Sequence, residues 1–244
     1  MWLRRATALW LVVAAVAFAS PACAGRYAFI VAVDDYAHLP RLRSAVADAR
    51  HVAAALEAAG FTTTLVLDAT AGQIAEEMAR FRSRLTDASL VVAYFAGHGV
   101  SLGSGSHFLP ADATVAAGRL KGTLPLGLMI EAISSPRAQT VVFFDACRLP
   151  LGARPDAGER APRRTAGIYI LHATAPLHAA TDAARAPGPF AAALAAALSE
   201  ENVTVEEVGR RVRLAVLRAT EGLQVPWETS SLIAPIRLGR RRAQ

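Results

Sequence analysis

The stretch Ser89-Leu-Val-Val-Ala-Tyr-Phe-Ala96, followed by Gly97-His98-Gly99, decides the fold of this chain and points to its chemistry. A second apolar run, Thr140-Val-Val-Phe-Phe144, is followed by Asp145-Ala-Cys147-Arg148. Apolar runs of this kind are typical of strands that are buried on both faces of a parallel sheet. Each run therefore predicts a buried strand that ends at a reactive side chain. A thiolate is a nucleophile, and a nearby imidazole can take the thiol proton or lower the pKa of the thiol.

The other apolar runs alternate between strand and helix patterns. Strands are expected at residues 27–33, 61–67, 90–95, 140–144, 167–173 and 231–237, with a short hairpin near 107–112. Helical spacing predicts helices at residues 42–59, 72–85, 125–133, 190–198 and 205–220,. This order predicts an α/β domain with a mostly parallel sheet and helices on both faces. Ligands of such sheets bind beyond the carboxyl ends of the strands, where His98 and Cys147 would meet if their strands are neighbours.

Residues 1–24 have the layout of a secretory signal peptide. A basic start and an apolar stretch at residues 6–19 precede the small-residue cleavage site Ala22-Cys23-Ala24,. The apolar stretch is shorter than the roughly 20 residues of a spanning helix, which disfavours an uncleaved anchor. Lipidation of Cys23 ranks below cleavage, because Ser20 stands where Leu is usual. We expect an exported protein, periplasmic or extracellular, that meets a membrane only through an uncleaved or lipidated N-terminus.

Signal-peptide cleavage would leave Cys147 as the only thiol, since the chain contains 2 cysteines. An unpaired cysteine in an exported chain cannot form an internal disulfide, and it is either intermolecular or reactive. A buried structural cysteine is the alternative interpretation. The position of Cys147 after a strand, rather than inside one, argues against that alternative.

Several other function classes are disfavoured by composition and motifs. The net charge of +6 is spread over arginine groups without interleaved aromatic residues, so we expect no nucleic-acid binding,. The segment Gly97-His98-Gly99 lacks the glycine fingerprint of a nucleotide loop. Ser101 and Ser104 lie outside the G-x-S-x-G pattern of serine hydrolases. The remaining histidines have no metal-ligand spacing, so no metal site is expected (His38, His51, His107, His172 and His178).

Four segments resemble the caspase-like cysteine peptidases, the clan of caspases and metacaspases, and specifically its bacterial metacaspase-type members. They are Phe29-Ile-Val-Ala-Val-Asp-Asp-Tyr36, Tyr94-Phe-Ala-Gly-His-Gly99, Phe144-Asp-Ala-Cys-Arg148, and Ala173-Thr-Ala-Pro176 followed by Asp182. His98 precedes Cys147 by 49 residues, which matches the spacing of about 50 that is an established property of caspases,. One departure is Ala32-Val33-Asp34, where the family usually has Gly-Asn.

The resemblance implies a three-layer caspase-like fold with a sheet of about six strands over residues 25–237. Within this range, residues 148–166 are rich in Pro, Gly and Arg without periodicity, which predicts an exposed loop, and the Arg-rich residues 238–244 predict a basic tail,. The implied reaction is peptide-bond hydrolysis through an acyl-enzyme, in which Cys147 attacks and His98 manages the proton. The N–H groups of Gly99 and Cys147 would form the oxyanion hole. A catalytically silent binding or regulatory module is the alternative function.

The resemblance also implies a substrate preference. Metacaspases cut after Arg or Lys and line the first pocket with acids, for which Asp145, Asp48 and Asp182 are the candidates here. Carboxylates bind guanidinium groups in a bidentate manner, so we expect polypeptide substrates with Arg, and second Lys, before the cut bond. No cofactor is expected. Some metacaspases need calcium, but no compact acidic loop specifies a calcium site.

The loop at 148–166 lies where the family is often self-processed. Its candidate cleavage sites are Arg154, Arg160, Arg163 and Arg164. A solvated linker is the alternative interpretation of this segment. The oligomeric state is not indicated by any pattern in the sequence.

Overall fold

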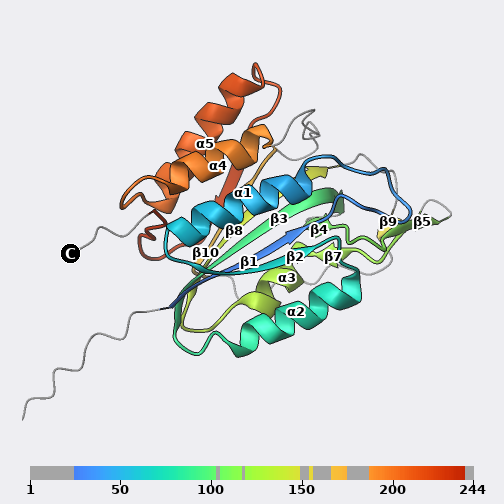
Figure 1. Ribbon diagram of the computed structural model, residues 1–244, viewed down its shortest axis with the longest axis horizontal. Helices are drawn as coiled ribbons and strands as arrows, with labels where there is room; N and C mark the ends of the chain where they lie inside the picture. Colours follow the sequence, from blue (N-terminus) through green and yellow to red (C-terminus); the bar gives the residue numbers. More distant parts are fainter. Residues whose placement is uncertain are drawn as a thin grey trace, which may run out of the picture.

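The computed structural model describes residues 25–102, 105–116, 119–148, 154–155, 166–174 and 187–239. Its centre is an 8-stranded sheet whose main path has the order β11-β10-β8-β3-β1-β2 (Figure 1). These strands are β1 (Gly25–Ala32), β2 (Thr62–Leu67), β3 (Ala88–Leu102), β8 (Gln139–Arg148), β10 (Ile168–His172) and β11 (Trp227–Ser230). Neighbours along the path are parallel, except that β11 is antiparallel to β10.

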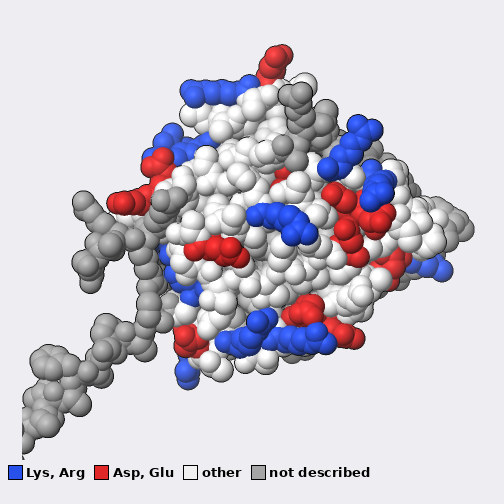
Figure 2. Space-filling model, viewed as in Figure 1, with Lys and Arg blue, Asp and Glu red and all other residues white. Residues whose placement is uncertain are grey.

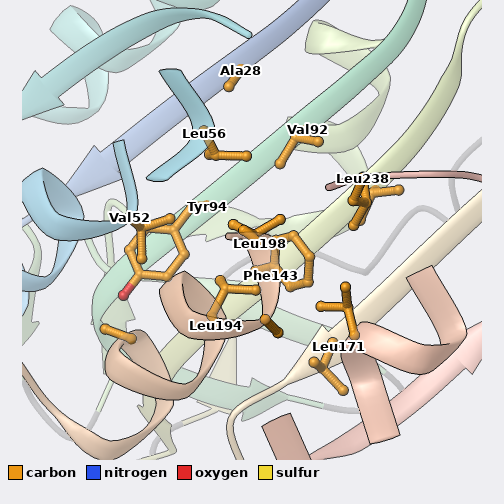
Figure 3. Close-up of a cluster of buried hydrophobic side chains, with 14 of the residues drawn as sticks. Ala28, Val52, Leu56, Val92, Tyr94, Phe143, Leu171, Leu194, Leu198 and Leu238 are labelled. Atoms are coloured by element: carbon orange, nitrogen blue, oxygen red, sulfur yellow. The ribbon is translucent and has the colours of Figure 1, made fainter. Parts of the chain in front are cut away.

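Helices cover both faces of this sheet. One face carries α1 (Ala45–Ala58), α4 (Pro189–Leu198) and α5 (Val205–Ala219), and the other carries α2 (Ala71–Ser83) and α3 (Leu126–Ile133). Side chains alternate along a strand, so β3 contributes to two separate cores. Tyr94 belongs to the core under α1, α4 and α5, which Figure 3 shows, whereas Phe95 belongs to the core under α2 and α3. The predicted three-layer α/β fold with a mostly parallel sheet is therefore confirmed.

The described residues also form five short strands, and pairing with one of them extends β3 beyond its predicted end. The strands are β4 (Gly105–Phe108) and β7 (Leu124–Pro125), which join the main sheet, and β5 (Thr114–Ala116), β6 (Arg119–Lys121) and β9 (Arg154–Pro155), which form a second sheet. The backbone of β4 pairs antiparallel with the last residues of β3, with Gly99 opposite Phe108. Consequently β3 continues to Leu102 instead of ending near residue 95, and His98 lies within the strand rather than after it.

The prediction of a strand at residues 231–237 is wrong. The edge strand is β11, which comes earlier in the chain, and residues 232–239 form a strap that passes the N-terminal end of α5, where Val205 donates its N–H to the carbonyl of Ile236. Ile236 and Leu238 of this strap are buried in the core under α1, α4 and α5. The guanidinium of Arg26 donates hydrogen bonds to the carbonyl groups of Ala59, Arg237, Leu238 and Gly239. The apolar residues of this segment are thus buried in a core under helices, and its strand-like pairing is limited to an isolated bridge between Arg237 and Thr204.

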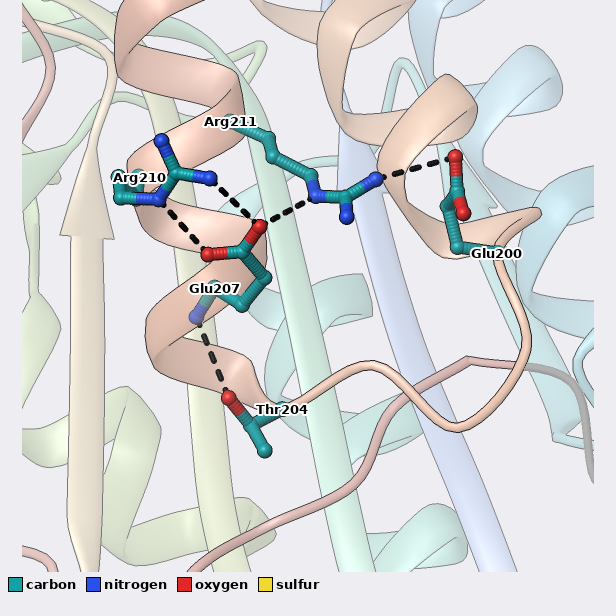
Figure 4. Close-up of polar contacts among 5 residues, drawn as sticks. All are labelled: Glu200, Thr204, Glu207, Arg210 and Arg211. Atoms are coloured by element: carbon teal, nitrogen blue, oxygen red, sulfur yellow. Dashed lines mark hydrogen bonds and ion pairs between the residues drawn. The ribbon is translucent and has the colours of Figure 1, made fainter.

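Charged residues of the surface are mixed in sign, as Figure 2 shows for one face. On α5, Glu207 pairs with both Arg210 and Arg211, and Arg211 also reaches Glu200 (Figure 4). Thr204 caps the same helix by accepting the backbone N–H of Glu207 at 3.3 Å. Exposed ion pairs of this kind contribute only about 0.2–1 kcal/mol each. These ion pairs nevertheless show that two arginines of the basic group at 210–213 belong to a solvated face of α5.

Within the described residues, no helix is both long enough and apolar enough to cross a membrane. The predicted signal peptide, including Cys23, lies outside the described residues. The first described residue, Gly25, is also the first residue of β1.

Candidate active site

The register of β3 against β8 brings the two reactive positions of the sequence together. In this parallel pair, His98 is the direct partner of Cys147, and Gly99 is the partner of Arg148. Backbones of adjacent strands lie about 4.8 Å apart. The two strands are neighbours, so the condition under which the backbones of His98 and Cys147 lie side by side is met. The side chain of Cys147 itself lies outside the described part of the structure.

The imidazole of His98 is held in a fixed orientation. It is 4% exposed, and its Nε2 lies 2.7 Å from the carbonyl oxygen of Pro40. A carbonyl oxygen can only accept, so Nε2 must carry a proton, and this assigns the tautomer from the hydrogen bond. In the neutral imidazole, Nδ1 is consequently the basic nitrogen. Such a carbonyl or carboxylate partner is the usual device that fixes which nitrogen of a histidine acts as a base.

Tyr36 supports the same histidine from the loop after β1. Its hydroxyl accepts the backbone N–H of His98 at 2.7 Å, and its ring centroid lies 4.6 Å from that of the imidazole. Both contacts come from a segment that also includes Pro40. The loop between β1 and α1 therefore positions the backbone and the side chain of His98 together.

Two different constraints require the glycines on either side of His98. Gly97 has a φ of +150°, and a Cβ there would lie 2.6 Å from the hydroxyl oxygen of Tyr36. A Cβ at Gly99 would lie 2.7 Å from the Cβ of Ala146 on β8. The first glycine thus gives room to the tyrosine that holds His98. The second allows β3 and β8 to approach each other at the level of the reactive pair.

The peptide N–H of Gly99 points toward β8. The carbonyl group of His98 accepts the N–H of Leu109 at 3.0 Å, on the side of β3 that β4 occupies. In a trans peptide the following N–H points the opposite way. Since β4 and β8 lie on opposite edges of β3, this N–H is directed to the strand that carries Cys147. This N–H therefore lies in the β3–β8 ladder, level with the reactive pair.

Two acidic side chains, Asp145 on β8 and Asp48 on α1, lie close enough to interact electrostatically. The hydroxyl of Tyr94 donates to Oδ2 of Asp145 at 2.8 Å. Burial raises the pKa of the partly buried Asp145 carboxyl to about 7, the hydrogen bond from Tyr94 opposes this, and the negative charge of Asp48 adds to it. Burial likewise raises the pKa of the Tyr94 hydroxyl. Asp145 is therefore a carboxyl that is costly to ionise until a cation comes near.

Asp48 contributes to this acidic group but also has a structural partner. Its Oδ1 accepts the backbone N–H of Gly188 at 2.7 Å, and the residue is 5% exposed. Gly188 is the N-cap of α4, so the carboxylate of Asp48 ties α1 to the start of α4. Burial raises the pKa of Asp48, and the hydrogen bond from Gly188 opposes that effect. The family resemblance assigns Asp48 to a substrate pocket, and the structure adds this helix-capping bond.

Two further sequence-based expectations concern residues outside the described part of the chain. Asp182 is one of them, and most of the loop at 148–166 is the other, apart from the short strand β9 that contains Arg154. Within the described residues, no group of three or more His, Cys, Asp or Glu side chains is arranged to hold a metal ion.

The residues that position His98 carry little signal in the sequence. Tyr36 stands out there only as the end of a strand-and-loop segment, and Pro40 acts through its backbone carbonyl, which leaves no side-chain signal.

The departure from the family pattern at Asp34 has a structural explanation. Its carboxylate accepts the N–H groups of Ala45 and Val46 at 2.9 and 3.2 Å, so it caps the N-terminus of α1,.

Comparisons with known proteins agree with this geometry. A family model described as a caspase domain matches residues 25–236. Among solved structures, the chain is similar to caspase-1 from Spodoptera frugiperda, with a TM-score of 0.69 and 17% sequence identity over 91% of this chain and 92% of that chain. At this identity the likeness shows the fold alone. No curated protein matches the chain. Because the family model spans most of its length, the chain belongs to the caspase-domain family, whose members are in general cysteine peptidases.

Proposed function

We propose that the protein is a cysteine-type endopeptidase of the metacaspase type, which cuts polypeptides after Arg and, second, after Lys. The observation that carries the proposal is the register that pairs His98 with Cys147, together with the tautomer that the carbonyl of Pro40 imposes on the imidazole. A thiol opposite a basic Nδ1 is the arrangement that nucleophilic catalysis by cysteine needs.

The proposed reaction proceeds in two halves. The thiol proton of Cys147 passes to Nδ1 of His98, and the thiolate attacks the scissile carbonyl to give a tetrahedral oxyanion. The imidazolium then donates its proton to the departing amine, which leaves an acyl-enzyme thioester. Water attacks this thioester while Nδ1 takes its proton, and the proton returns to the sulfur as the acid product leaves. Protons and bonds balance over the cycle, so no cofactor is needed.

The oxyanion would be stabilised by backbone donors. The N–H of Gly99 points toward β8, and the N–H of Cys147 is the second proposed donor. Removal of one such donor costs other enzymes roughly 3–4 kcal/mol of transition-state stabilisation. Gly99 suits this role because a side chain there would collide with β8.

The preference for Arg rests on the acidic group beside the reactive pair. Asp145 precedes Cys147 by two residues on β8, and burial raises the pKa of its carboxyl to about 7. A guanidinium is planar, always charged and matched to a carboxylate in bidentate geometry, so it suits this carboxyl better than an ammonium. Asp48 reinforces the negative potential, and Asp182 remains a third proposed wall residue.

The test is cleavage profiling. Wild-type protein and the Cys147→Ala variant are incubated with a peptide library, with and without calcium, and the cut sites are sequenced. We expect cuts after Arg, fewer after Lys, and none with the variant. Cleavage only after Asp would show that the specificity is wrong, and cleavage by Cys147→Ala would show that the nucleophile is wrong.

A silent binding or regulatory module is the second candidate, and the test for it is thiol labelling. An arginine-directed electrophile should label Cys147 rapidly in the wild type, and His98→Ala should abolish the labelling. A conservative control substitution on β6, Lys121→Arg, should label like the wild type. Absence of labelling in all three proteins, with the fold intact, would favour the binding module.

Self-processing and export are further proposals. Arg154 lies in β9, whose backbone pairs with β6, so we expect cuts after Arg160, Arg163 or Arg164 instead. An intact chain after long incubation, in a preparation that still cuts a basic peptide, would reject self-processing. Export is expected to remove residues 1–24.

A further inference from the structure

A small cavity lies at the edge of the sheet where the parallel strands end. Its volume is about 260 Å³, and six described residues line it: Asp35, Tyr36 and Ala37 after β1, Thr70 after β2, and Ala111 and Asp112 after β4. The backbone N–H of Ala37 donates to the carbonyl of Ala111 at 2.9 Å, and the N–H of Ala111 donates to the carbonyl of Ala69 at 3.0 Å. Hydrogen bonds between three separate segments therefore hold the walls of the cavity together.

The cavity adjoins the imidazole of the reactive pair. Tyr36, which lines the cavity, has its ring centroid 4.6 Å from that of His98, and its hydroxyl accepts the backbone N–H of His98 at 2.7 Å. On another wall, Leu109 donates its N–H to the carbonyl of His98 at 3.0 Å, two residues before Ala111. A group that enters the cavity is thus separated from His98 by the thickness of one aromatic ring.

The strand order fixes the side of His98 on which the cavity lies. The strands β8, β3, β1 and β2 are parallel neighbours in that order, so their carboxyl ends share one edge of the sheet (Figure 1). Asp145 and Cys147 belong to β8 and His98 to β3, whereas the cavity lies beyond the ends of β1 and β2. The cavity and Asp145 are therefore on opposite sides of His98.

This placement matches the leaving half of a substrate. In the proposed reaction the acyl half stays on the sulfur of Cys147, with its arginine beside Asp145. The amine half leaves at Nδ1 of His98. A substrate whose arginine lies on the β8 side consequently carries the chain after the cut bond across His98 and toward the cavity.

The chemistry of the walls suits a long side chain with a positive end. The ring of Tyr36 and the methyl groups of Ala37 and Ala111 are apolar, and none of the six lining residues is basic. Asp35 and Asp112 are exposed and carry negative charge at neutral pH,. An aliphatic stem can pack on the apolar walls while its cationic head meets the carboxylates.

Both carboxylates are available to such a head. Oδ1 of Asp112 accepts the backbone N–H of Ala71 at 2.8 Å, which uses one of its two oxygens. Asp35 pairs with Arg41 at 3.7 Å, and the two side chains are 62% and 72% exposed. A long, exposed pair of this kind contributes little and can be exchanged for a better one.

We propose that this cavity binds a lysine or arginine side chain at one of the first two positions after the cut bond. The inference rests on the proposed peptidase function and narrows its substrates to segments with basic residues on both sides of the cut. It also ranks the proposed self-processing sites. Arg163 is followed directly by Arg164, whereas no basic residue occupies the two positions after Arg154, Arg160 or Arg164. The cut after Arg163 should therefore be preferred.

The first experiment varies the substrate and needs no variant. Internally quenched peptides carry arginine before the cut bond and lysine, norleucine or glutamate at each of the first two positions after it. Norleucine has the aliphatic stem of lysine without the charge. At one of the two positions, kcat/KM should be about threefold to tenfold higher with lysine than with norleucine, and lowest with glutamate. The difference should shrink in about 0.5 M salt, because exposed charges are then screened.

Two outcomes of this series have different meanings. Equal kcat/KM for lysine and norleucine at both positions, in a protein that cuts after arginine, would overturn the basic subsite and leave the peptidase function standing. No cleavage of any peptide would refute the peptidase function and the inference with it.

The second experiment assigns the preference to the cavity. The double variant Asp35→Asn with Asp112→Asn removes both charges, and asparagine can still accept the N–H of Ala71 through its side-chain oxygen. It should cut the lysine and norleucine peptides equally, at the rate of the wild type on norleucine. Glu76→Gln is the matched control, since it removes an exposed carboxylate that pairs with Arg80 on α2, and it should keep the lysine preference.

A substrate that ends at arginine separates the two halves of the site. An arginyl aminocoumarin amide has no residue after the cut bond, so the wild type and the double variant should cleave it equally. An equal loss on this amide and on the lysine peptide would show that the carboxylates do not act on the leaving chain. Retention of the lysine preference by the double variant would place the subsite elsewhere. Either result overturns the proposal, and unchanged urea midpoints verify that the variants are folded.

Discussion

The carboxyl group of Asp145 should couple substrate binding to proton release. Burial raises its pKa from 3.8 to about 7, with Asp48 acting in the same direction and the hydroxyl of Tyr94 acting against both. In the empty site below pH 7 the carboxyl is therefore mostly protonated. A bound guanidinium favours the charged form, so binding at that pH must expel the proton.

The free-energy cost of ionising Asp145 follows from the rise in its pKa. A rise of about three pH units, at roughly 1.4 kcal/mol for each, sets a ceiling of about 4 kcal/mol on the cost of ionising Asp145 in the folded protein. Its partial exposure reduces this, and we expect about 1–3 kcal/mol. Because the pKa of Asp145 is raised in the folded state, its contribution to the free energy of unfolding is fully present below pH 3.8. That contribution is lost as the pH rises to about 7 and does not change further above that value,. Asp145→Asn should therefore stabilise the free protein at pH 8 and not at pH 4.

The assay is titration calorimetry with a reversible arginyl ligand on the Cys147→Ala background, so that the reactive pair does not contribute its own protons. Measurements in two buffers of different ionisation enthalpy count the protons released. We expect about 0.9 proton per ligand at pH 6 and about 0.1 at pH 8. Tyr94→Phe should move this profile to higher pH, because it removes the hydrogen bond that opposes the rise in the pKa of Asp145.

Two results would refute the reasoning. One is binding at pH 6 without proton release, which would mean that Asp145 is ionised in the free protein. The other is equal release by Asp145→Asn, which would place the titrating group elsewhere. Tight binding of the ligand to Asp145→Asn would further remove this carboxyl from the recognition of arginine.

Four substitutions test the framework of the fold. Gly97→Ala should lower the free energy of unfolding by about 1–3 kcal/mol and reduce kcat/KM, since it strains the backbone and displaces Tyr36, and an unchanged urea midpoint would contradict this,. Gly209→Ala on α5 should cost a similar amount, because its Cβ would lie 2.1 Å from the hydroxyl oxygen of Tyr169,. Tyr169→Phe should restore part of that loss, and no restoration would mean that the hydroxyl is not the obstacle. Thr70→Ala should cost about 1 kcal/mol in the same assay, since it removes the capping box of α2, and it should leave kcat/KM unchanged,.

The sequence predicted the strands and helices whose hydrophobic residues recur with a clear period. It missed the features that depend on pairing with a segment distant in the sequence. The buried strands and the amphipathic helices are encoded locally, so their positions agree with the structure to within a few residues. The end of β3 is different, because it is extended by pairing with β4, and no local sequence pattern indicates that pairing. The same holds for residues 231–237, in which the apolar alternation looks like a strand but is buried in a core under helices. The sequence left open whether the strands that end at His98 and Cys147 are neighbours, and the strand order of the sheet places β3 beside β8.

The candidate site divides in the same way. His98 and Cys147 could be chosen from the sequence because a reactive side chain after a buried strand is unusual. The partner of the imidazole could not, since the carbonyl of Pro40 has the same chemistry as every other carbonyl and is recognisable only by its position 2.7 Å from Nε2. The hydroxyl of Tyr36 is a similar case. What the sequence supplies is the reactive pair, and what the fold supplies is the orientation that makes one nitrogen the base.

The carboxyl of Asp145 carries an electrostatic cost in the free protein. Burial and the negative charge of Asp48 both raise the cost of ionising Asp145, so a fold selected only for stability would replace one of the two acids. Asp48 is retained in part by its bond to Gly188 at the start of α4, but within the described residues the side chain of Asp145 has only the hydroxyl of Tyr94 as a hydrogen-bond partner. A neutral residue at position 145 could accept that hydrogen bond equally well. The proposed arginyl substrate would account for a carboxyl at this position, because its arrival would remove the electrostatic cost that the free protein carries.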